Sequence, residues 1–222
     1  MALWSYEFNI EEDELREKDN NIVKKFALST VLTDKLKIEP DNFIQDSCHM
    51  ALTKLNKSWD LSKMDPLFFP IVEEGHWVLV SVNMFLKEIC WFNSLGGSHD
   101  TKYFVSAKNV VTNFSKACLQ PGVLNKDISL FDWKYPTDYP HQKSFFFIFS
   151  HHVYFDNPIL FVFMHDYGLY TMLYMESWNG KKMDTTFEPH MIANYRKLVA
   201  GILLLSPRND ILTSEFVEKY CN

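Results

Sequence analysis

One helix-forming stretch that begins directly after a turn constrains the fold of this chain most. It runs from His165 to Trp178 with the sequence HDYGLYTMLYMESW, and its apolar residues recur at the spacing of a helix face, at Leu169, Met172, Leu173 and Met175. Tyr167 and Gly168 precede this run, which predicts a loop-to-helix turn. Backbone N–H groups and the positive end of the helix dipole converge at such a turn and lower the pKa of a thiol placed there. The residue at this turn, however, is Tyr167.

Two strand-like segments, HWVLVSVN and KEICWFNS, follow a short apolar run at 67–72 and predict a β-hairpin. If residues 83–86 form its loop, Val82 pairs with Lys87, and His76 lies directly opposite Asn93. Opposed side chains have Cβ atoms about 4.5–5.5 Å apart, which brings an asparagine oxygen within reach of an imidazole N–H. The spacing therefore predicts a general base, His76, with Asn93 as its orienting residue.

Charge, composition and cysteine spacing exclude several classes of protein. The chain has 222 residues, of which 47% are hydrophobic, so it can bury the core of one domain with at most a short appendage. Its net charge of -6 and the lack of a Lys/Arg cluster argue against a nucleic-acid or membrane partner. Its four cysteines lack CxxC spacing, so neither a zinc site nor a disulfide framework is predicted. The acidic N-terminus has no signal-peptide core, which favours an intracellular protein.

Two cysteines were candidates for a substitute nucleophile. The stretch Thr101–Leu119 has the apolar spacing of an amphipathic surface helix, and Cys118 belongs to that pattern. Cys90 is an odd number of residues from Asn93, so a regular strand would point the two side chains to opposite faces. Both thiols are therefore predicted to be buried and structural.

The motifs resemble the ubiquitin-like protease family, the SUMO-processing cysteine peptidases and their plant relatives. Two motifs are similar to the family's His and Asp signature. The first is FFPI followed shortly by His76-Trp77. The second is an acidic or amide residue, here Asn93, which lies seventeen positions after the histidine and directly before Ser-Leu. The run Asp166–Trp178 resembles the central helix, which the family opens with Asp-Cys-Gly. The family's cysteine is replaced by Tyr167, and its usual aspartate by Asn93, which papain-like peptidases elsewhere use as the orienting residue.

The resemblance implies an α+β fold of the papain-like cysteine-peptidase type, with the central helix packed on a mixed or antiparallel sheet. It covers about residues 60–209, and we expect a catalytic domain at 61–210. A diverged or truncated helical region at 1–60, with a helix at Phe43–Leu55, would precede it, and a tail at 211–222 would follow it. The implied activity is hydrolysis after the Gly-Gly of a SUMO-type modifier in the nucleus or cytoplasm, without a cofactor.

The resemblance also assigns roles to single residues. Trp77 matches the aromatic residue that packs on the Gly-Gly tail of the modifier, and Gly168 belongs to the same substrate-binding turn. Pro140 and Gln142 match the start of the motif whose glutamine donates a hydrogen bond to the oxyanion. In the family this glutamine lies about six positions before the cysteine, so a short loop holds it in place.

In this chain, the 20 residues Phe145–Met164 separate Gln142 from the central helix. Fourteen of them are apolar and seven are phenylalanine. Polar residues and a proline interrupt the middle of this segment, which argues against a membrane-spanning helix. The pair His151-His152 has no third ligand at metal-binding spacing, so we predict an exposed loop rather than a metal site. We expect the segment to form a poorly packed surface excursion that leaves Gln142 without a fixed position. One hypothesis is that it is translated intron sequence, because its flanks join into a continuous family motif.

A tyrosine cannot replace the thiol of the family. The pKa of a phenol is near 10, so little phenolate exists at neutral pH, and the ring fills the space of the substrate carbonyl. The sequence leaves three functions open: an impaired or inactive cysteine-type peptidase, a non-catalytic pseudoenzyme that binds a ubiquitin-like modifier, or a misspliced or decaying copy. No feature of the sequence indicates an oligomeric state.

Overall fold

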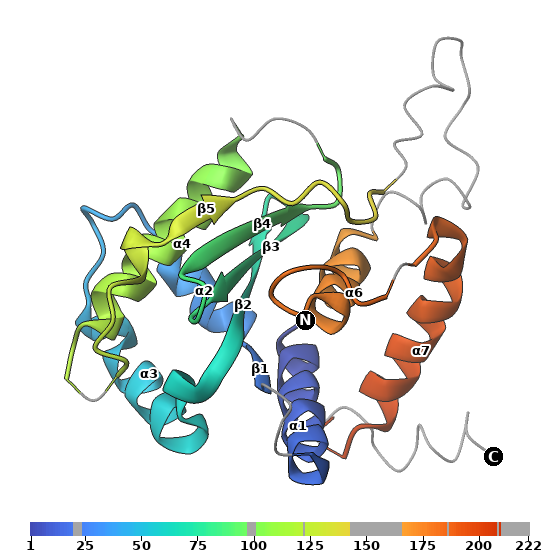
Figure 1. The fold of residues 1–222 in the computed structure, drawn as a ribbon, viewed down its shortest axis with the longest axis horizontal. Coiled ribbons are helices and arrows are strands. Elements are labelled where there is room, and N and C mark those ends of the chain that lie inside the picture. The colour runs from blue at the N-terminus through green and yellow to red at the C-terminus, as the bar shows by residue number, and fades with distance from the viewer. Residues whose placement is uncertain are drawn as a thin grey trace. The chain divides into compact units, whose positions relative to one another are not determined.

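The computed structural model describes residues 1–19, 24–96, 101–121, 123–142, 166–185, 187–207 and 209 (Figure 1). The chain divides into two compact units, Met1–Thr186 and Phe187–Asn222. The first unit contains the sheet and all of the predicted site residues, and the second contains one long helix. Each unit is described by itself.

A five-stranded mixed sheet forms the centre of the first unit, as expected for an α+β fold. Its spatial order follows the chain, with bounds β1 Lys24–Ala27, β2 Met64–Glu73, β3 His76–Asn83, β4 Glu88–Asn93 and β5 Asp132–Lys134. The strands β2, β3 and β4 pair antiparallel, whereas β1 and β5 pair parallel to their neighbours. A 3₁₀ turn, Ile128–Leu130, precedes β5.

The predicted register of the β3–β4 hairpin is wrong by two residues. Val78, rather than His76, is the partner of Asn93, and Asn83 pairs with Glu88. Asn83 stays in the ladder because its side-chain oxygen also accepts the N–H of Leu86 and so closes the turn from within the strand. A shift of two residues leaves each side chain on its original face, so His76 and Asn93 still share one face of the sheet.

Three helices cover one face of the sheet: α2 Thr30–Leu36, α3 Asp46–Trp59 and α4 Lys102–Cys118 (Figure 1). The hydroxyl of Thr101 caps α4 by accepting the N–H of Phe104, which agrees with the helix expected at 101–119. The helix expected at 43–55 instead begins at Asp46. The main core lies between these helices and the sheet, and includes Leu67, Phe69, Val80, Val82, Trp91 and Phe114.

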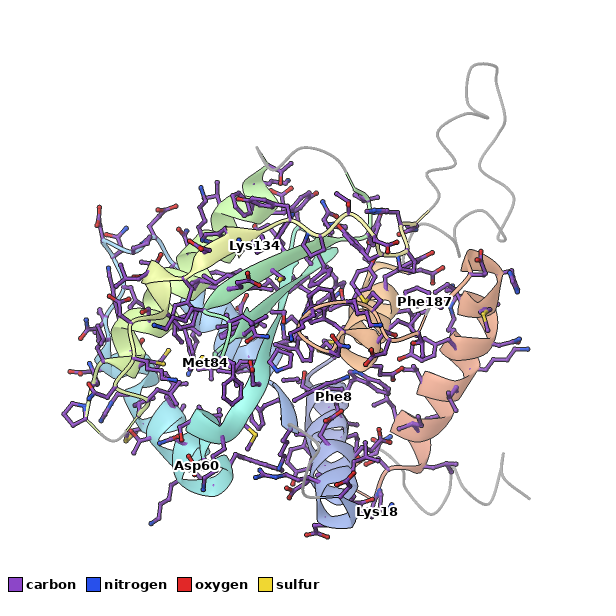
Figure 2. The ribbon with its side chains drawn as sticks, viewed as in Figure 1. Phe8, Lys18, Asp60, Met84, Lys134 and Phe187 are labelled. Atoms are coloured by element: carbon purple, nitrogen blue, oxygen red, sulfur yellow. The ribbon has the colours of Figure 1, made fainter. Side chains whose placement is uncertain are left out.

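The opposite face of the sheet is covered by α1 Ala2–Lys18 and by α6 Tyr167–Ser177, the predicted central helix. Phe8 of α1 packs edge-on against Phe68 of β2, with ring centroids 6.0 Å apart, and Figure 2 shows side chains filling this layer. Phe92 of β4 contacts the rings of Tyr174 and Trp178. The central strands are therefore buried on both faces, which explains their nearly continuous apolar sequences.

The N-terminal region is not purely helical, because it also supplies the edge strand β1. The side chain of Asn9 in α1 accepts the N–H of Ala27 and donates to its carbonyl, at 2.7 and 2.9 Å. This pair of bonds fastens α1 to β1. The same region therefore extends the sheet and covers one of its faces.

In the described part of the second unit, a 3₁₀ turn, Pro189–Met191, leads into the helix α7 Ile192–Leu205. Among the described residues, no helix combines the length and apolarity needed to cross a bilayer.

Candidate active site

A buried hydrogen bond joins His76, at the start of β3, to Asn93, at the end of β4. The imidazole Nε2 and the amide Oδ1 are 2.8 Å apart, and the two residues are only 3% and 5% exposed. The amide of Asn93 also donates through Nδ2 to the carbonyl of Gly96, while Oδ1 accepts the N–H of Leu95. Because Nδ2 is engaged elsewhere, Oδ1 is the atom that faces the imidazole, and Nε2 carries the proton.

The second ring nitrogen of His76 is then a lone-pair acceptor. Nδ1 is buried and has no hydrogen-bond partner among the residues that the structure describes. Burial lowers the pKa of His76, and the hydrogen bond that the ring donates to Asn93 opposes this shift only in part. The geometry thus provides a neutral imidazole with a free basic nitrogen, as a general base requires.

Two tyrosine rings flank this imidazole. The ring centroid of Tyr167 lies 4.4 Å from that of His76 in an edge-on arrangement, and that of Tyr103 lies 4.6 Å away. Tyr167 is the first residue of α6, where the first-turn N–H groups have no partner within the helix. The side chain at this turn therefore lies beside the base and at the positive end of the helix dipole.

The phenol of Tyr167 is a poor nucleophile in this position. Burial raises its pKa, and the neighbouring Tyr103 raises it further. The oxygen consequently keeps its proton at neutral pH, although a base lies close by. The aromatic ring also occupies space next to the imidazole that a smaller side chain would leave open.

Trp77 and Gly168 lie against each other beside this turn. A Cβ atom placed on Gly168 would be 3.6 Å from Trp77 Cδ1 and 3.7 Å from Met1 Cε. Trp77 is only partly buried, and it points to the face of β3 opposite His76. The absence of a side chain at Gly168 thus lets the helix backbone approach the indole.

The segment Tyr139–Gln142 is clamped between β4 and α6. The Tyr139 hydroxyl accepts the N–H of Asn93 and donates to its carbonyl, at 3.2 and 3.3 Å. The N–H of Gln142 donates to the carbonyl of Ser94 at 2.7 Å, and the Tyr174 hydroxyl donates to that of Pro140 at 2.5 Å. The sequence predicted that the insertion leaves Gln142 without a fixed position, but hydrogen bonds hold the backbone of this residue in place.

None of the thiols in the described part of the chain lies at the turn before α6. Cys48, Cys90 and Cys118 are free and buried. Burial raises the pKa of Cys90 to about 12 and raises that of Cys118 as well, so both thiols stay protonated. The insertion Phe145–Met164, with its histidine pair, and the tail 211–222 lie outside the described residues, so the predictions made for them stay predictions.

Two residues of this site, Tyr103 and Tyr139, were not predicted from the sequence. Tyr103 is the second residue of α4, where its sequence context is that of an ordinary residue in an amphipathic helix. Tyr139 directly precedes the Pro140–Gln142 motif, and this adjacency is the one signal that points to it. Neither residue has a periodicity or spacing that relates it to His76.

The scaffold of a papain-like cysteine peptidase is defined by three features: the sheet, the central helix α6, and the His76–Asn93 pair beside the N-terminus of that helix. The model of the Ulp1 protease family, C-terminal catalytic domain, matches residues 10–146. The chain therefore belongs to the Ulp1 protease family. The match begins within α1, whereas the motifs alone traced the resemblance only from about residue 60.

Solved structures of the same family share this fold. A SUMO protease Ulp1 with its catalytic cysteine oxidised to a sulfonic acid matches with a TM-score of 0.58 at 16% identity, covering 90% of this chain and 73% of its own. The Ulp1 domain in complex with Smt3, the yeast ortholog of SUMO, has a TM-score of 0.56 at 16% identity, with coverages of 90% and 72%. The Ulp1-like SUMO protease domain of Chaetomium thermophilum has a TM-score of 0.54 at 14% identity, with coverages of 88% and 68%. No curated protein sequence matches the chain.

Proposed function

We propose that this chain is a Ulp1-family domain without peptidase activity that still binds the C-terminal tail of a SUMO-type modifier in the nucleus or cytoplasm. The observation that carries the proposal is the position of Tyr167. Its ring stands at the start of α6, 4.4 Å from the imidazole of His76, where the family motif has its cysteine.

The chemistry of the family explains why this substitution stops the reaction. A thiolate attacks the carbonyl carbon after Gly-Gly, the oxyanion is held by N–H groups and glutamine, and the amine leaves with a proton from histidine. Water then hydrolyses the thioester. The phenol of Tyr167 has a raised pKa and cannot supply the thiolate. Losing one member of such a triad costs several orders of magnitude in rate.

The contact between Trp77 and Gly168 supports the retention of tail binding. A Gly-Gly tail has no side chains, so its backbone can lie close along an exposed indole face. Trp77 remains partly exposed, and Gly168 lets the backbone of α6 pack against the indole and hold it in place. The hydrogen bond between His76 and Asn93 and the clamp on Gln142 favour a site that still keeps its shape.

Binding of SUMO to the full chain, measured by fluorescence anisotropy with a dye on SUMO, tests this proposal. Trp77→Ala should weaken binding about tenfold or more, because a tryptophan at the centre of a contact contributes strongly to affinity. The control is Phe85→Ala, because Phe85 is 77% exposed on the β3–β4 turn, and this variant should bind like the wild type. SUMO lacking its Gly-Gly tail should bind weakly. The absence of any binding, or equal binding by the Trp77 variant, would favour a decaying copy.

A further inference from the structure

A second cavity, separate from the candidate active site, lies between β4, β5 and the segment after α6. Its volume is about 490 Å³, within the range of cavities that hold small ligands or peptide side chains. Its walls include Cys90, Lys134, Tyr135, Trp178, Lys181 and Lys182. No residue that lines it belongs to the site around His76.

Trp178 forms one wall of this cavity. The side chain is 3% exposed and packs edge-on against Phe92, with ring centroids 4.9 Å apart. Its Nε1 has no hydrogen-bond partner within the described ranges. The indole nitrogen is itself buried, so the ring lines the cavity as an apolar wall on which a ligand side chain can pack.

The charged groups around the cavity also call for a ligand with acceptors. Lys134, Lys181 and Lys182 face only two carboxylates, Glu88 and Asp138, and Lys134 forms a 3.7 Å ion pair with Glu88. Lys181 and Lys182 are exposed, and in the described part of the chain neither forms an ion pair. The mouth of the cavity is thus locally positive, although the whole chain carries a net charge of -6.

The two lysines are presented by a loop whose shape is fixed before any ligand binds. The side-chain oxygen of Asn179 accepts the N–H groups of Lys181 and Lys182 at 2.9 and 3.0 Å. The carbonyl of Gly180 accepts a hydrogen bond from Asn83 at the end of β3, which ties the loop to the sheet. Little conformational entropy is then lost on binding, which favours affinity.

We propose that this cavity binds an acidic peptide segment of a partner protein. Its carboxylates would pair with Lys181 and Lys182, and an apolar side chain would pack on Trp178 and Tyr135. A nucleic acid would meet only three lysines on a chain of net charge -6, and such a polyanion needs many more cationic contacts. The cavity offers no arginine fork of the kind that recognises phosphate, which favours carboxylates.

The test uses the full chain and a capped, dye-labelled peptide of alternating glutamate and leucine, followed by fluorescence anisotropy and by the indole N–H signals in NMR spectra. The peptide should bind in the micromolar range and shift the Trp178 signal, whereas the same peptide with glutamine should bind at least about tenfold more weakly. Lys181→Gln with Lys182→Gln should weaken binding about tenfold. Trp178→Phe, which reduces the apolar wall of the cavity, should weaken it severalfold.

A matched control separates the cavity from general charge effects. Lys54→Gln with Lys57→Gln removes two exposed charges from α3 and should leave binding unchanged. The proposal is wrong if both double variants lose affinity equally, if the Trp178 signal does not move, or if the glutamine peptide binds as well. Displacement of the peptide by inorganic phosphate at equal concentration would show a general anion site and would also overturn it. None of these variants alters Trp77 or Tyr167, so the result is independent of SUMO binding.

Discussion

At the scale of single residues, the state of His76 depends on the different surroundings of its two ring nitrogens. Nε2 is held by Asn93, while Nδ1 is buried without a partner among the described residues. Both conditions favour the neutral ring, because a buried imidazolium would have one N–H that no acceptor satisfies. His76 therefore remains ready to accept a proton, although Tyr167 gives it no acidic partner.

The lowered pKa of His76 makes the stability of the fold depend on pH. The unfolded chain has a histidine pKa near 6.5, and the folded chain has a lower one, so the unfolded state binds the proton first as pH falls. The contribution of His76 is fully present above pH 6.5 and is lost as pH falls from that value towards the folded pKa. Urea unfolding at pH 7.5 and 5.5 should show a smaller drop for His76→Gln than for the wild type. Equal drops would mean that the ring is protonated in the folded state.

At the scale of elements, α6 is held at both ends by residues from distant parts of the chain. Its N-terminal turn contacts His76 and Trp77, while Lys25 of β1 donates to the carbonyl of Glu176 at 2.6 Å near its C-terminus. A cation at this end opposes the negative pole of the helix dipole. The edge strand β1 thus stabilises the helix that carries Tyr167.

Replacing this lysine should destabilise the first unit. Lys25→Met keeps most of the apolar stem but leaves the carbonyls at the end of α6 without a cationic donor, which should lower the free energy of unfolding by about 1–2 kcal/mol. Lys18→Met, at an exposed position of α1, should change it by less than about 0.5 kcal/mol. Urea denaturation of both variants at neutral pH measures the difference. Equal effects would show that Lys25 does not cap α6.

Two glycines should respond to alanine with opposite signs. Gly180 has φ +95°, and an added Cβ atom would lie 2.6 Å from Asn83 Nδ2, so Gly180→Ala should cost about 1–3 kcal/mol. Gly201 lies within α7 with no heavy atom within 4 Å of the added Cβ, so Gly201→Ala should favour the helix by up to about 1 kcal/mol. Thermal unfolding followed by circular dichroism measures both. A neutral Gly180→Ala would contradict the rigid loop described above.

Side-chain periodicity identified the hairpin and α6, but it could not identify β1 or the exact register. β1 has only four residues, and its first, Lys24, is buried through an ion pair with Asp13 that no local pattern reveals. The contact between His76 and Asn93 was predictable because a shift of two residues preserves side-chain faces. Tyr103 and Tyr139 reach the site from separate segments, so their roles depend on tertiary packing that the sequence does not display.

At the scale of the whole molecule, the chain keeps the architecture of a Ulp1-family domain around its candidate active site. The sheet brings His76 and Asn93 together, and α6 brings Tyr167 and Gly168 to the same end of the sheet. The anchors of Tyr139–Gln142 hold the third segment of the site in place. We therefore propose that this site lacks only a sulfur atom.

The most direct measurement is the rate at which the full chain is labelled by SUMO carrying a thiol-reactive electrophile at its C-terminus. The wild type should not be labelled, Tyr167→Cys should be, and Tyr167→Cys with deletion of 145–164 should react faster. Adding His76→Ala to Tyr167→Cys should slow labelling by about a hundredfold or more, because the thiol then loses its base. Labelling of the wild type that persists in His76→Ala, or no labelling of either Tyr167→Cys chain, would contradict the account.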